Sequence, residues 1–331
     1  AYEVMPSLVG SEMCIRDRRQ GYRVIGLHEG YTGLFNPSPR TVDIDYPMAD
    51  GIFNQGGSFL QMSRFKPKDS DFENNFNLKF FTDNNIKLLV TVGGDDTAST
   101  ANRIAKFLEA KKYPIANIHV PKTIDNDVWG TDMTFGFHSS VEIATNVLDC
   151  IHTTATSHRR IMVIEIMGNK AGWLTLYSGI AGGADIILIP EIPYDIDKVI
   201  DACEKRAQSG KTFSIIAVAE GAMDIAEAAM KKKERAKKRA EAGETTVTNR
   251  IAKQIEAATG FESRTVVPGH ILRGGSPSAY DRVLATKFGA RAAMLIKQEK
   301  YGYTVAKIGS KISENKLSDV TMKTKFVPEN D

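Results

Sequence analysis

This sequence of 331 residues has few cysteines, no long apolar runs and little excess of positive over negative charge. Its three cysteines are too few and too scattered for a disulfide scaffold, so we expect a reducing, cytoplasmic compartment. No apolar run approaches the ~20 residues of a membrane helix, so no membrane association of that kind is expected. The formal net charge is only +3, which does not indicate a nucleic-acid partner.

What the sequence does contain is 42% hydrophobic residues, in strand-like runs that alternate with helical patterns. A chain of this length can build two α/β domains with ample cores. The expected strands are 88–92, 115–120, 161–166, 185–190 and 214–219, and the expected helices are 102–111, 141–154, 173–181 and 197–209.

The first chemical signal is a turn at the end of strand 88–92, where the sequence reads Gly93-Gly94-Asp95-Asp96-Thr97. In an open α/β sheet, ligands bind at the carboxyl ends of the strands. Glycine lets backbone N–H groups approach phosphate oxygens, and the start of the following helix adds a favourable dipole. The carboxylates would weaken a pure anion site, so one of them is expected to hold Mg²⁺. The alternative is a surface turn whose aspartate caps a helix.

A second turn follows strand 115–120 and reads Pro121-Lys122-Thr123-Ile124-Asp125-Asn126-Asp127. Carboxylates two positions apart on an extended backbone point to the same side. One can then bind metal while the other accepts a proton from an attacking hydroxyl, the usual arrangement for phosphoryl transfer. The alternative is an Asx-rich turn without chemistry.

Together these motifs resemble the phosphofructokinases of the bacterial type, most of all those that use pyrophosphate. The resemblance runs from about Gly21 to near the C-terminus. Its further motifs are Gly57-Ser58-Phe59-Leu60, Arg64, Ser157-His158-Arg159-Arg160, Met167-Gly168, Ala219-Glu220-Gly221, Arg264 and Gly269-His270-Ile271-Leu272-Arg273-Gly274-Gly275. It implies two Rossmann-like three-layer α/β domains with mostly parallel sheets, and transfer of a phosphoryl group to the 1-hydroxyl of fructose 6-phosphate.

The resemblance also implies the role of each site residue. Asp125 would accept the hydroxyl proton, with Thr123 beside it, and Asp95 and Asp127 would organise Mg²⁺. The donor would be bound or selected by Gly94, Asp96, Thr97, Lys122 and Arg64. The sugar phosphate would be held by Arg160, Met167, Gly168, Glu220, Arg264, His270 and Arg273. Because the family's counterparts of Arg160 and Arg264 reach a neighbouring subunit's site, a homodimer or homotetramer with shared active sites is implied.

Each of these assignments has a plainer alternative. The guanidinium groups of Arg160, Arg264 and Arg273 could each bind a sugar phosphate through two hydrogen bonds. A lone arginine is more often an ordinary surface residue. The placement of these arginines beside Gly-rich strand ends favours binding. His270 could be a satisfied core histidine.

The donor is predicted from Asp96 and Lys122, where ATP-using members of the family usually carry glycine. A second carboxylate beside Asp95 would repel the α-phosphate of a nucleotide, by roughly 3 kcal/mol at about 5 Å and an effective dielectric near 20. Lys122 could pair with Asp96, neutralise pyrophosphate or be a solvated residue. We therefore expect a reversible, pyrophosphate-dependent enzyme of glycolysis or gluconeogenesis, with ATP as the alternative donor.

Two departures from the family pattern stand out. Asn169 replaces the arginine that usually follows Met167-Gly168, so the role of that arginine is in doubt. The family's first strand and its Gly-Gly-Asp-x-x-Gly-Leu-Asn turn are absent, and residues 1–18 resemble translated adapter sequence. Residues 1–20 are therefore expected to be a non-native or disordered leader. A signal peptide is not indicated, because no apolar segment follows a basic start.

The resemblance also predicts how the domains divide along the chain. Residues 21–137 plus 274–308 would bind the phosphoryl donor, and residues 138–273 plus 309–331 would bind fructose 6-phosphate.

The segment 224–249 is unusually rich in lysine, alanine and glutamate, and is expected to form a solvated helix that Gly243 can end. Contact with a polyanion is the alternative there. For the whole chain, the other hypotheses are a lipid or dinucleotide kinase, and a non-catalytic protein that binds phosphate ligands or polyanions.

Overall fold

The structure is a computed structural model, and it describes residues 21–244 and 246–330. The chain divides into two compact units. Unit 1 contains the described residues up to Ile124, then Val128–Ser139 and Arg273–Thr324; unit 2 contains Asp125–Asp127, Ser140–Leu272 and the described residues from Lys325. These units differ from the predicted domains chiefly at residues 309–324, which belong to unit 1. The predicted leader lies outside the described residues.

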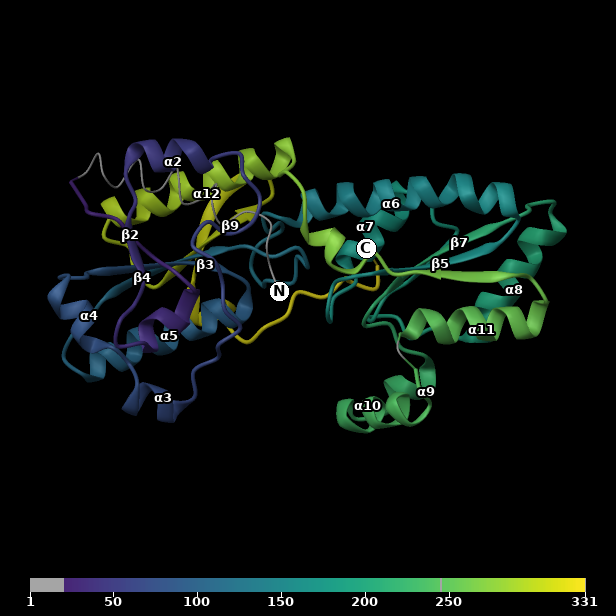
Figure 1. The fold of residues 1–331 in the computed structure, drawn as a ribbon, viewed down its shortest axis with the longest axis horizontal. Coiled ribbons are helices and arrows are strands. Elements are labelled where there is room, and N and C mark those ends of the chain that lie inside the picture. Colours follow the sequence, from purple (N-terminus) through teal and green to yellow (C-terminus); the bar gives the residue numbers. More distant parts are fainter. Residues whose placement is uncertain (1–20, 245, 331) are drawn as a thin grey trace. The chain divides into compact units, whose positions relative to one another are not determined.

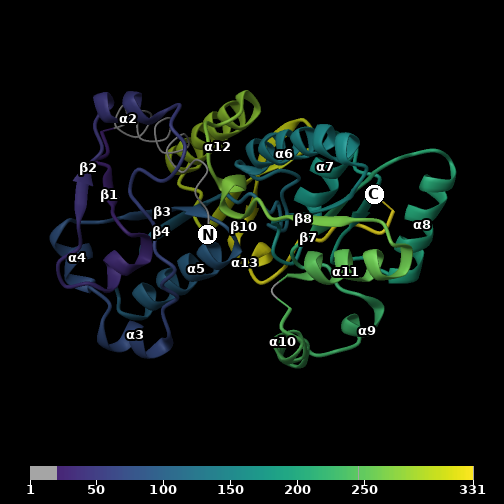
Figure 2. The same cartoon turned by 45° about the vertical axis from the view of Figure 1, so that its right-hand side comes forward.

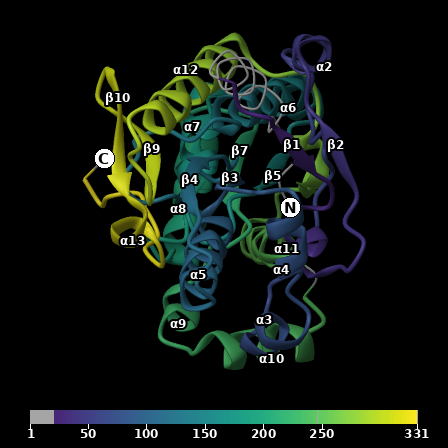
Figure 3. The same cartoon turned by 90° about the vertical axis from the view of Figure 1, so that its left-hand side faces the viewer.

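The centre of unit 1 is a four-stranded sheet in the order β10-β9-β4-β3. Its strands are β3 (Leu88–Gly93), β4 (Ala116–Pro121), β9 (Tyr303–Ile308) and β10 (Lys311–Lys316). The first three are parallel, and β10 is antiparallel to β9 at one edge of the sheet (Figure 3). Because β3 and β4 are parallel neighbours, the two turns that follow them emerge at the same edge.

Helices cover both faces of this sheet (Figure 1). On one face lies α5 (Asp95–Ala110), which buries Ala98, Ala101, Ile104 and Leu108 at helical spacing. The other face is covered by α12 (Ala279–Lys297). The smaller elements of unit 1 are β1 (Ile25–Leu27), η1 (Gly30–Phe35), β2 (Thr41–Asp43), α2 (Tyr46–Ile52), α3 (Asp69–Asn74), α4 (Leu78–Asp83) and α13 (Leu317–Val320).

Unit 2 is built on a parallel sheet in the order β6-β7-β5-β8. Its strands are β5 (Ile161–Ile166), β6 (Ile186–Leu188), β7 (Ser214–Ala219) and β8 (Ser263–Val266). On one face lie α6 (Phe137–His158, in unit 2 from Ser140) and α7 (Trp173–Ala181), and on the other α8 (Ile196–Gln208) and α11 (Val247–Thr259) (Figure 1). Every residue of β7 is buried, as expected of a parallel strand covered on both faces.

An excursion leaves this sheet after β7 and extends beyond α11 (Figure 2). It contains α9 (Ile225–Ala228) and α10 (Lys232–Glu241). All of α10 belongs to the described part of the chain, and it buries none of its residues. Gly243, with a φ of 65°, follows its end. The prediction of a solvated helix that Gly243 ends is therefore confirmed for Lys232–Glu241, whereas α9 and the start of α11, which also fall within residues 224–249, bury side chains.

The predicted fold class, α/β with mostly parallel sheets, is confirmed. Strands β5 and β7 match the predicted ranges residue for residue. The helix predicted from Asn102 was wrong at its start, because α5 begins at Asp95. Gly94 serves as its N-cap, and the two aspartates of its first turn are favoured by the helix dipole. Among the described residues, no helix is long and apolar enough to cross a membrane.

Candidate functional site

The turn after β3 requires glycine for a steric reason. A Cβ at Gly93 would lie 2.3 Å from Oγ1 of Thr97, so this position cannot take a side chain without moving Thr97. The carbonyl of Gly94 accepts hydrogen bonds from the backbone N–H groups of Thr97 and Ala98, at 3.0 and 3.1 Å. The predicted donor-binding residues Gly94 and Thr97 are thus brought together in the first turn of α5.

The two carboxylates of this turn have different surroundings. Asp95 is half-buried, and its Oδ1 accepts a hydrogen bond of 3.2 Å from the backbone N–H of Met322. Asp96 is exposed, and its Oδ2 lies 2.5 Å from Nζ of Lys66. Sequence reasoning did not identify Lys66, because nothing local links it to Asp96.

The first residues of the second turn, Pro121 and Lys122, lie directly beside the first turn. Gly93 and Pro121 are paired in the register of β3 and β4, and the backbone N–H of Lys122 donates a 2.8 Å hydrogen bond to the carbonyl of Gly93. The Lys122 side chain is fully buried, so the interpretation of Lys122 as a solvated residue was wrong. The carbonyl of Thr123 accepts a hydrogen bond of 2.8 Å from Oγ1 of Thr134, which fixes the turn from the other side.

Asp125, Asn126 and Asp127 belong to unit 2, whereas Asp95 and Asp96 belong to unit 1. Asp125 is buried, with 7% of its surface exposed, and Asp127 is half-buried. Asn126 has a φ of 53°, a left-handed conformation that asparagine tolerates. The carbonyl of Asp127 accepts a hydrogen bond from the backbone N–H of Lys325, at 2.8 Å. The backbone between Asp125 and Asp127 is therefore bent at Asn126 and held in place by the hydrogen bond from Lys325.

In unit 2, the carboxyl ends of β5 and β7 bring together three of the predicted sugar-phosphate residues. Met167 and Gly168 follow β5, and Glu220 follows β7. Oε1 of Glu220 accepts hydrogen bonds from the backbone N–H groups of Gly168, at 3.2 Å, and Asn169, at 2.7 Å. Gly168 has a φ of 151°, and a Cβ there would lie 2.6 Å from a backbone oxygen, so only glycine fits. Glu220 therefore fixes the loop that exposes Asn169.

Arg160 and Arg264 lie at the opposite end of the same sheet. Arg160 directly precedes β5, and Arg264 is the second residue of β8. Both bind Glu262: Nε of Arg160 lies 2.7 Å from its carboxylate, and Nη2 of Arg264 forms a second ion pair with it. The prediction that these two arginines stand beside Gly-rich strand ends was therefore wrong, because Arg160 follows Ser157-His158-Arg159 and Arg264 follows Glu262-Ser263. The sequence does not show which end of a strand an arginine joins until the register is known.

The remaining predicted residues are spread over both units. His270, in η2 (Gly269–Arg273), is exposed, so its interpretation as a core histidine was wrong. Arg273 is half-buried and is the first residue of the last segment of unit 1. Arg64, also in unit 1, is exposed.

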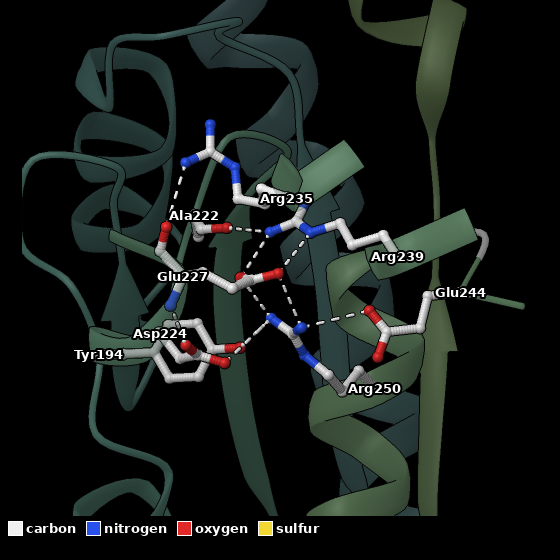
Figure 4. Close-up of polar contacts among 8 residues, drawn as sticks. All are labelled: Tyr194, Ala222, Asp224, Glu227, Arg235, Arg239, Glu244 and Arg250. Carbon is white, nitrogen blue, oxygen red and sulfur yellow. Dashed lines mark hydrogen bonds and ion pairs between the residues drawn. The ribbon is translucent and has the colours of Figure 1, made fainter. Parts of the chain in front are cut away.

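Sequence reasoning also missed a buried ionic cluster at the base of the excursion (Figure 4). Glu227 is fully buried, and its two oxygens accept hydrogen bonds of 2.6 to 2.9 Å from Arg239 and Arg250. Arg250 also donates to Tyr194, at 3.0 Å, and to Glu244, at 3.2 Å. The lysine-rich composition of this segment was visible in the sequence, but the carboxylate at its base was not singled out.

A divalent cation was expected at the acidic turns. Within each unit, the described residues contain no group of three or more His, Cys, Asp or Glu placed to hold a metal. Mg²⁺ usually takes one or two carboxylates, together with waters and substrate phosphates, rather than a full protein cage. The oxygen donors of Asp95, Asp125 and Asp127 are of the right kind.

The fold and these turns define a class: two α/β units with glycine turns and carboxylates at the carboxyl ends of parallel strands. The sequence profile described as Phosphofructokinase matches residues 11–296. The chain therefore belongs to the phosphofructokinase family.

Several relatives extend this comparison. The chain is 45% identical to an ATP-dependent 6-phosphofructokinase of Spirochaeta thermophila, over 94% of this chain and 85% of that protein. It is 41% identical to ATP-dependent 6-phosphofructokinase 3 of Bacteroides thetaiotaomicron, over 93% and 86%. It is also 40% identical to a pyrophosphate–fructose 6-phosphate 1-phosphotransferase of Streptomyces coelicolor, over 93% and 87%. Relatives named for either donor thus align along nearly the whole chain.

Solved structures show the same fold. A phosphofructokinase from Saccharomyces cerevisiae matches with a TM-score of 0.82 and 25% identity, over 97% of this chain and 44% of that chain, so this chain spans less than half of the yeast protein. A pyrophosphate-dependent phosphofructokinase from Marinobacter aquaeolei matches with a TM-score of 0.81 and 22% identity, over 99% and 84%.

Proposed function

We propose that this chain is a 6-phosphofructokinase, which transfers the terminal phosphoryl group of a donor to the 1-hydroxyl of fructose 6-phosphate. The observation that carries the proposal is the adjacency of the two turns, held together by the hydrogen bond from Lys122 to Gly93, in a chain of this family. A glycine turn and a carboxylate-bearing segment that follow neighbouring strands along the chain suit a reaction that needs bound phosphate and a proton acceptor.

The proposed step conserves atoms and charge. The 1-hydroxyl oxygen attacks the terminal phosphorus of the donor, the bond from that phosphorus to the bridging oxygen breaks, and the hydroxyl proton passes to Asp125 with Thr123 beside it. Asp95 and Asp127 would hold Mg²⁺, which supplies charge neutralisation on the phosphates when bound. Gly94, Thr97 and Arg64 would hold the donor, and Met167, Gly168, Glu220, His270 and Arg273 would hold the sugar phosphate.

ATP is the donor we favour. Two of the relatives described above are named ATP-dependent, and Asp96 is already paired with Lys66, so its repulsion of a nucleotide is reduced. Pyrophosphate is the second candidate, favoured by Asp96 and Lys122 themselves and by the name of the Streptomyces coelicolor relative. In that case the leaving group is phosphate instead of ADP.

A homodimer or homotetramer with shared sites is part of the proposal. Arg160 and Arg264 lie at the amino ends of β5 and β8, whereas Glu220 and Gly168 lie at the carboxyl ends of the same sheet. Side chains at opposite ends of one sheet cannot hold the same small ligand, so we assign the two arginines to the site of a second copy. Mixing Arg264→Ala with Glu220→Ala subunits should then restore part of the activity that each variant lacks.

The test of the activity is turnover with fructose 6-phosphate and Mg²⁺, using ATP and pyrophosphate as donors in parallel. Asp125→Asn should lower kcat by about 10³-fold, because asparagine cannot accept the proton, while the unfolding transition and donor binding stay close to those of the unchanged protein. Turnover that survives this substitution would refute the assignment of Asp125. Binding of phosphate ligands without turnover by the unchanged protein would support a non-catalytic binding protein instead.

A further inference from the structure

The pair formed by Lys66 and Asp96 takes part in no chemical step of the proposed mechanism, but it lies at the turn of residues 93–97 that is proposed to bind the donor. Nζ of Lys66 is 2.5 Å from Oδ2 of Asp96, and the two side chains are 71% and 70% exposed. Asp96 is in the first turn of α5, next to Asp95 and Thr97. Lys66, from a separate segment of unit 1, is therefore in contact with Asp96, the residue whose negative charge would discriminate between donors.

The position of Lys66 does not depend on this ion pair. The next residue, Pro67, is buried, and its carbonyl accepts a 2.7 Å hydrogen bond from Nη1 of Arg103. Nη2 of the same arginine lies 2.7 Å from the carboxylate of Asp69. The Arg103 guanidinium also lies over the ring of Phe72, 4.8 Å from its centroid. These contacts fix the chain at Pro67 and in the residues that follow it.

The helix geometry explains why Lys66 reaches Asp96. Asp96 and Arg103 are two helical turns apart on α5, so their side chains leave the same face of the helix. Arg103 holds Pro67 and Asp69 close to its own turn of α5. Lys66, the residue before Pro67, therefore lies beside Asp96. A substitution at Lys66 should therefore remove its charge without releasing the segment.

The electrostatic consequence concerns the third phosphate of a nucleotide. An unpaired carboxylate at Asp96 would repel the α-phosphate of ATP, which pyrophosphate lacks. An ammonium group in contact with that carboxylate turns an isolated negative charge into a short dipole, whose field falls off much faster with distance. The pair thus weakens the discrimination that Asp96 would otherwise impose.

We propose that Lys66 determines donor specificity by neutralising Asp96, so that a nucleoside triphosphate is accepted at a turn that would otherwise favour pyrophosphate. This inference rests on the proposed function. Lys66 acts here through Asp96 and is a positioning and charge-balancing residue, not a catalytic one.

The experiment compares the unchanged protein with Lys66→Gln, Asp96→Gly and the double variant, at low ionic strength and saturating fructose 6-phosphate. We expect Lys66→Gln to lower kcat/KM for ATP about fivefold relative to pyrophosphate, through KM with kcat within about twofold. With Asp96→Gly already present, the same substitution should leave the donor ratio unchanged. Calorimetric titration with ATP and with pyrophosphate, without sugar phosphate, should show the same selective loss of ATP affinity.

The matched control is Lys79→Gln, which removes an exposed lysine of unit 1 that pairs with Asp83. It should leave the donor ratio unchanged. A donor ratio within twofold of the unchanged protein for Lys66→Gln, or an equal loss for both donors, would overturn the inference, as would a failure of Asp96→Gly to cancel the effect. If the unchanged protein turns over neither donor, the proposed function fails, and the calorimetric affinity ratio alone decides the role of Lys66.

Discussion

The two units each contain a lysine or arginine group bound to a carboxylate, but the two groups differ in exposure. In unit 1 the Lys66 and Asp96 side chains are 71% and 70% exposed. In unit 2 the Glu227 side chain is fully buried, and those of Arg239 and Arg250 are 23% and 13% exposed (Figure 4). The first pair connects a loop to the start of α5, beside Gly93 and Gly94. The second connects α9, α10 and α11 at the base of the excursion.

The difference in burial separates function from stability. An exposed ion pair contributes little to folding, but its charges still act on a ligand that approaches from solvent. A buried carboxylate must keep its partners, because an uncompensated charge in the interior is costly. Burial by itself raises the pKa of Glu227, but hydrogen bonds from Arg239 and Arg250 more than offset it and hold that pKa well below its usual range.

The largest expected effect is therefore at Glu227. Glu227→Gln removes the charge that compensates Arg239 and Arg250, and should lower the free energy of unfolding of unit 2 by about 3–5 kcal/mol. Urea denaturation followed by tryptophan fluorescence can measure this in unit 2 alone. Trp129 and Trp173 are the two tryptophans of the chain and belong to units 1 and 2 respectively, so the experiment uses a Trp129→Phe background.

The control for this prediction is an exposed pair in the same unit. Lys205 lies 2.6 Å from Asp201 on α8, with side chains 70% and 56% exposed. Lys205→Gln should change the unfolding free energy by less than about 0.5 kcal/mol. Equal effects at Glu227 and Lys205 would mean that burial is not what distinguishes the two kinds of ion pair.

The next largest effect concerns His119, a buried titratable group of unit 1 with only a neutral partner. Its Nδ1 lies 2.9 Å from Oγ1 of Thr91, and its Nε2 has no hydrogen-bond partner among the described residues. Burial lowers the pKa of His119 to about 4.

Below about pH 6.5 the unfolded chain binds a proton at His119, whereas the folded chain binds it only near pH 4. The contribution of neutral His119 to the free energy of unfolding is therefore complete above about pH 6.5 and is lost as the pH falls toward 4. The loss should reach on the order of 3 kcal/mol at the acid end of this window. Thermal unfolding between pH 4 and 7 should show this decline in the unchanged protein and a flatter profile in His119→Gln. Parallel profiles would assign the acid sensitivity to other groups.

Much of the fold could be predicted from the sequence because its strands are buried on both faces. The runs at β5 and β7 are mostly apolar and rich in β-branched residues, and each is followed within two residues by a glycine. Their limits were predicted to the residue. The start of α5 was missed because Gly93 and Gly94 were interpreted as a turn separate from the helix. In the structure Gly94 is the N-cap itself.

The parts of the site that could not be predicted depend on contacts between distant segments. Lys66 and Asp96 are 30 positions apart, and Arg103 brings them together through Pro67. The positions of Arg160 and Arg264 at the amino end of their sheet depend on the register of β5 and β8. No local pattern carries either piece of information, whereas the Gly-Gly-Asp turn is a local pattern and was found.

A smaller expected effect is the response of the two ion pairs, Lys66 with Asp96 and Glu227 with its arginines, to added salt. At about 1 M ionic strength the screening length is near 3 Å, so an exposed charge acts only on its immediate neighbours. The roughly fivefold change in donor ratio expected for Lys66→Gln should therefore fall below about twofold in 1 M KCl. The destabilisation by Glu227→Gln should change much less, because solvent ions do not reach that carboxylate. A salt-independent donor ratio would indicate that Lys66 acts by shape and not by charge.

The smallest expected effect is the stability of Lys66→Gln itself. Its ion pair is exposed, and the segment around it is held by Arg103, so the unfolding free energy of unit 1 should change by less than about 0.5 kcal/mol. Urea denaturation followed by fluorescence of Trp129, in a Trp173→Phe background, would measure it. A large loss of stability would mean that Lys66 holds the loop, and any change in donor ratio would then follow from a displaced segment. A change in donor ratio with unchanged stability separates the two roles, because only a charge that acts on the ligand can alter selectivity while leaving the fold as it was.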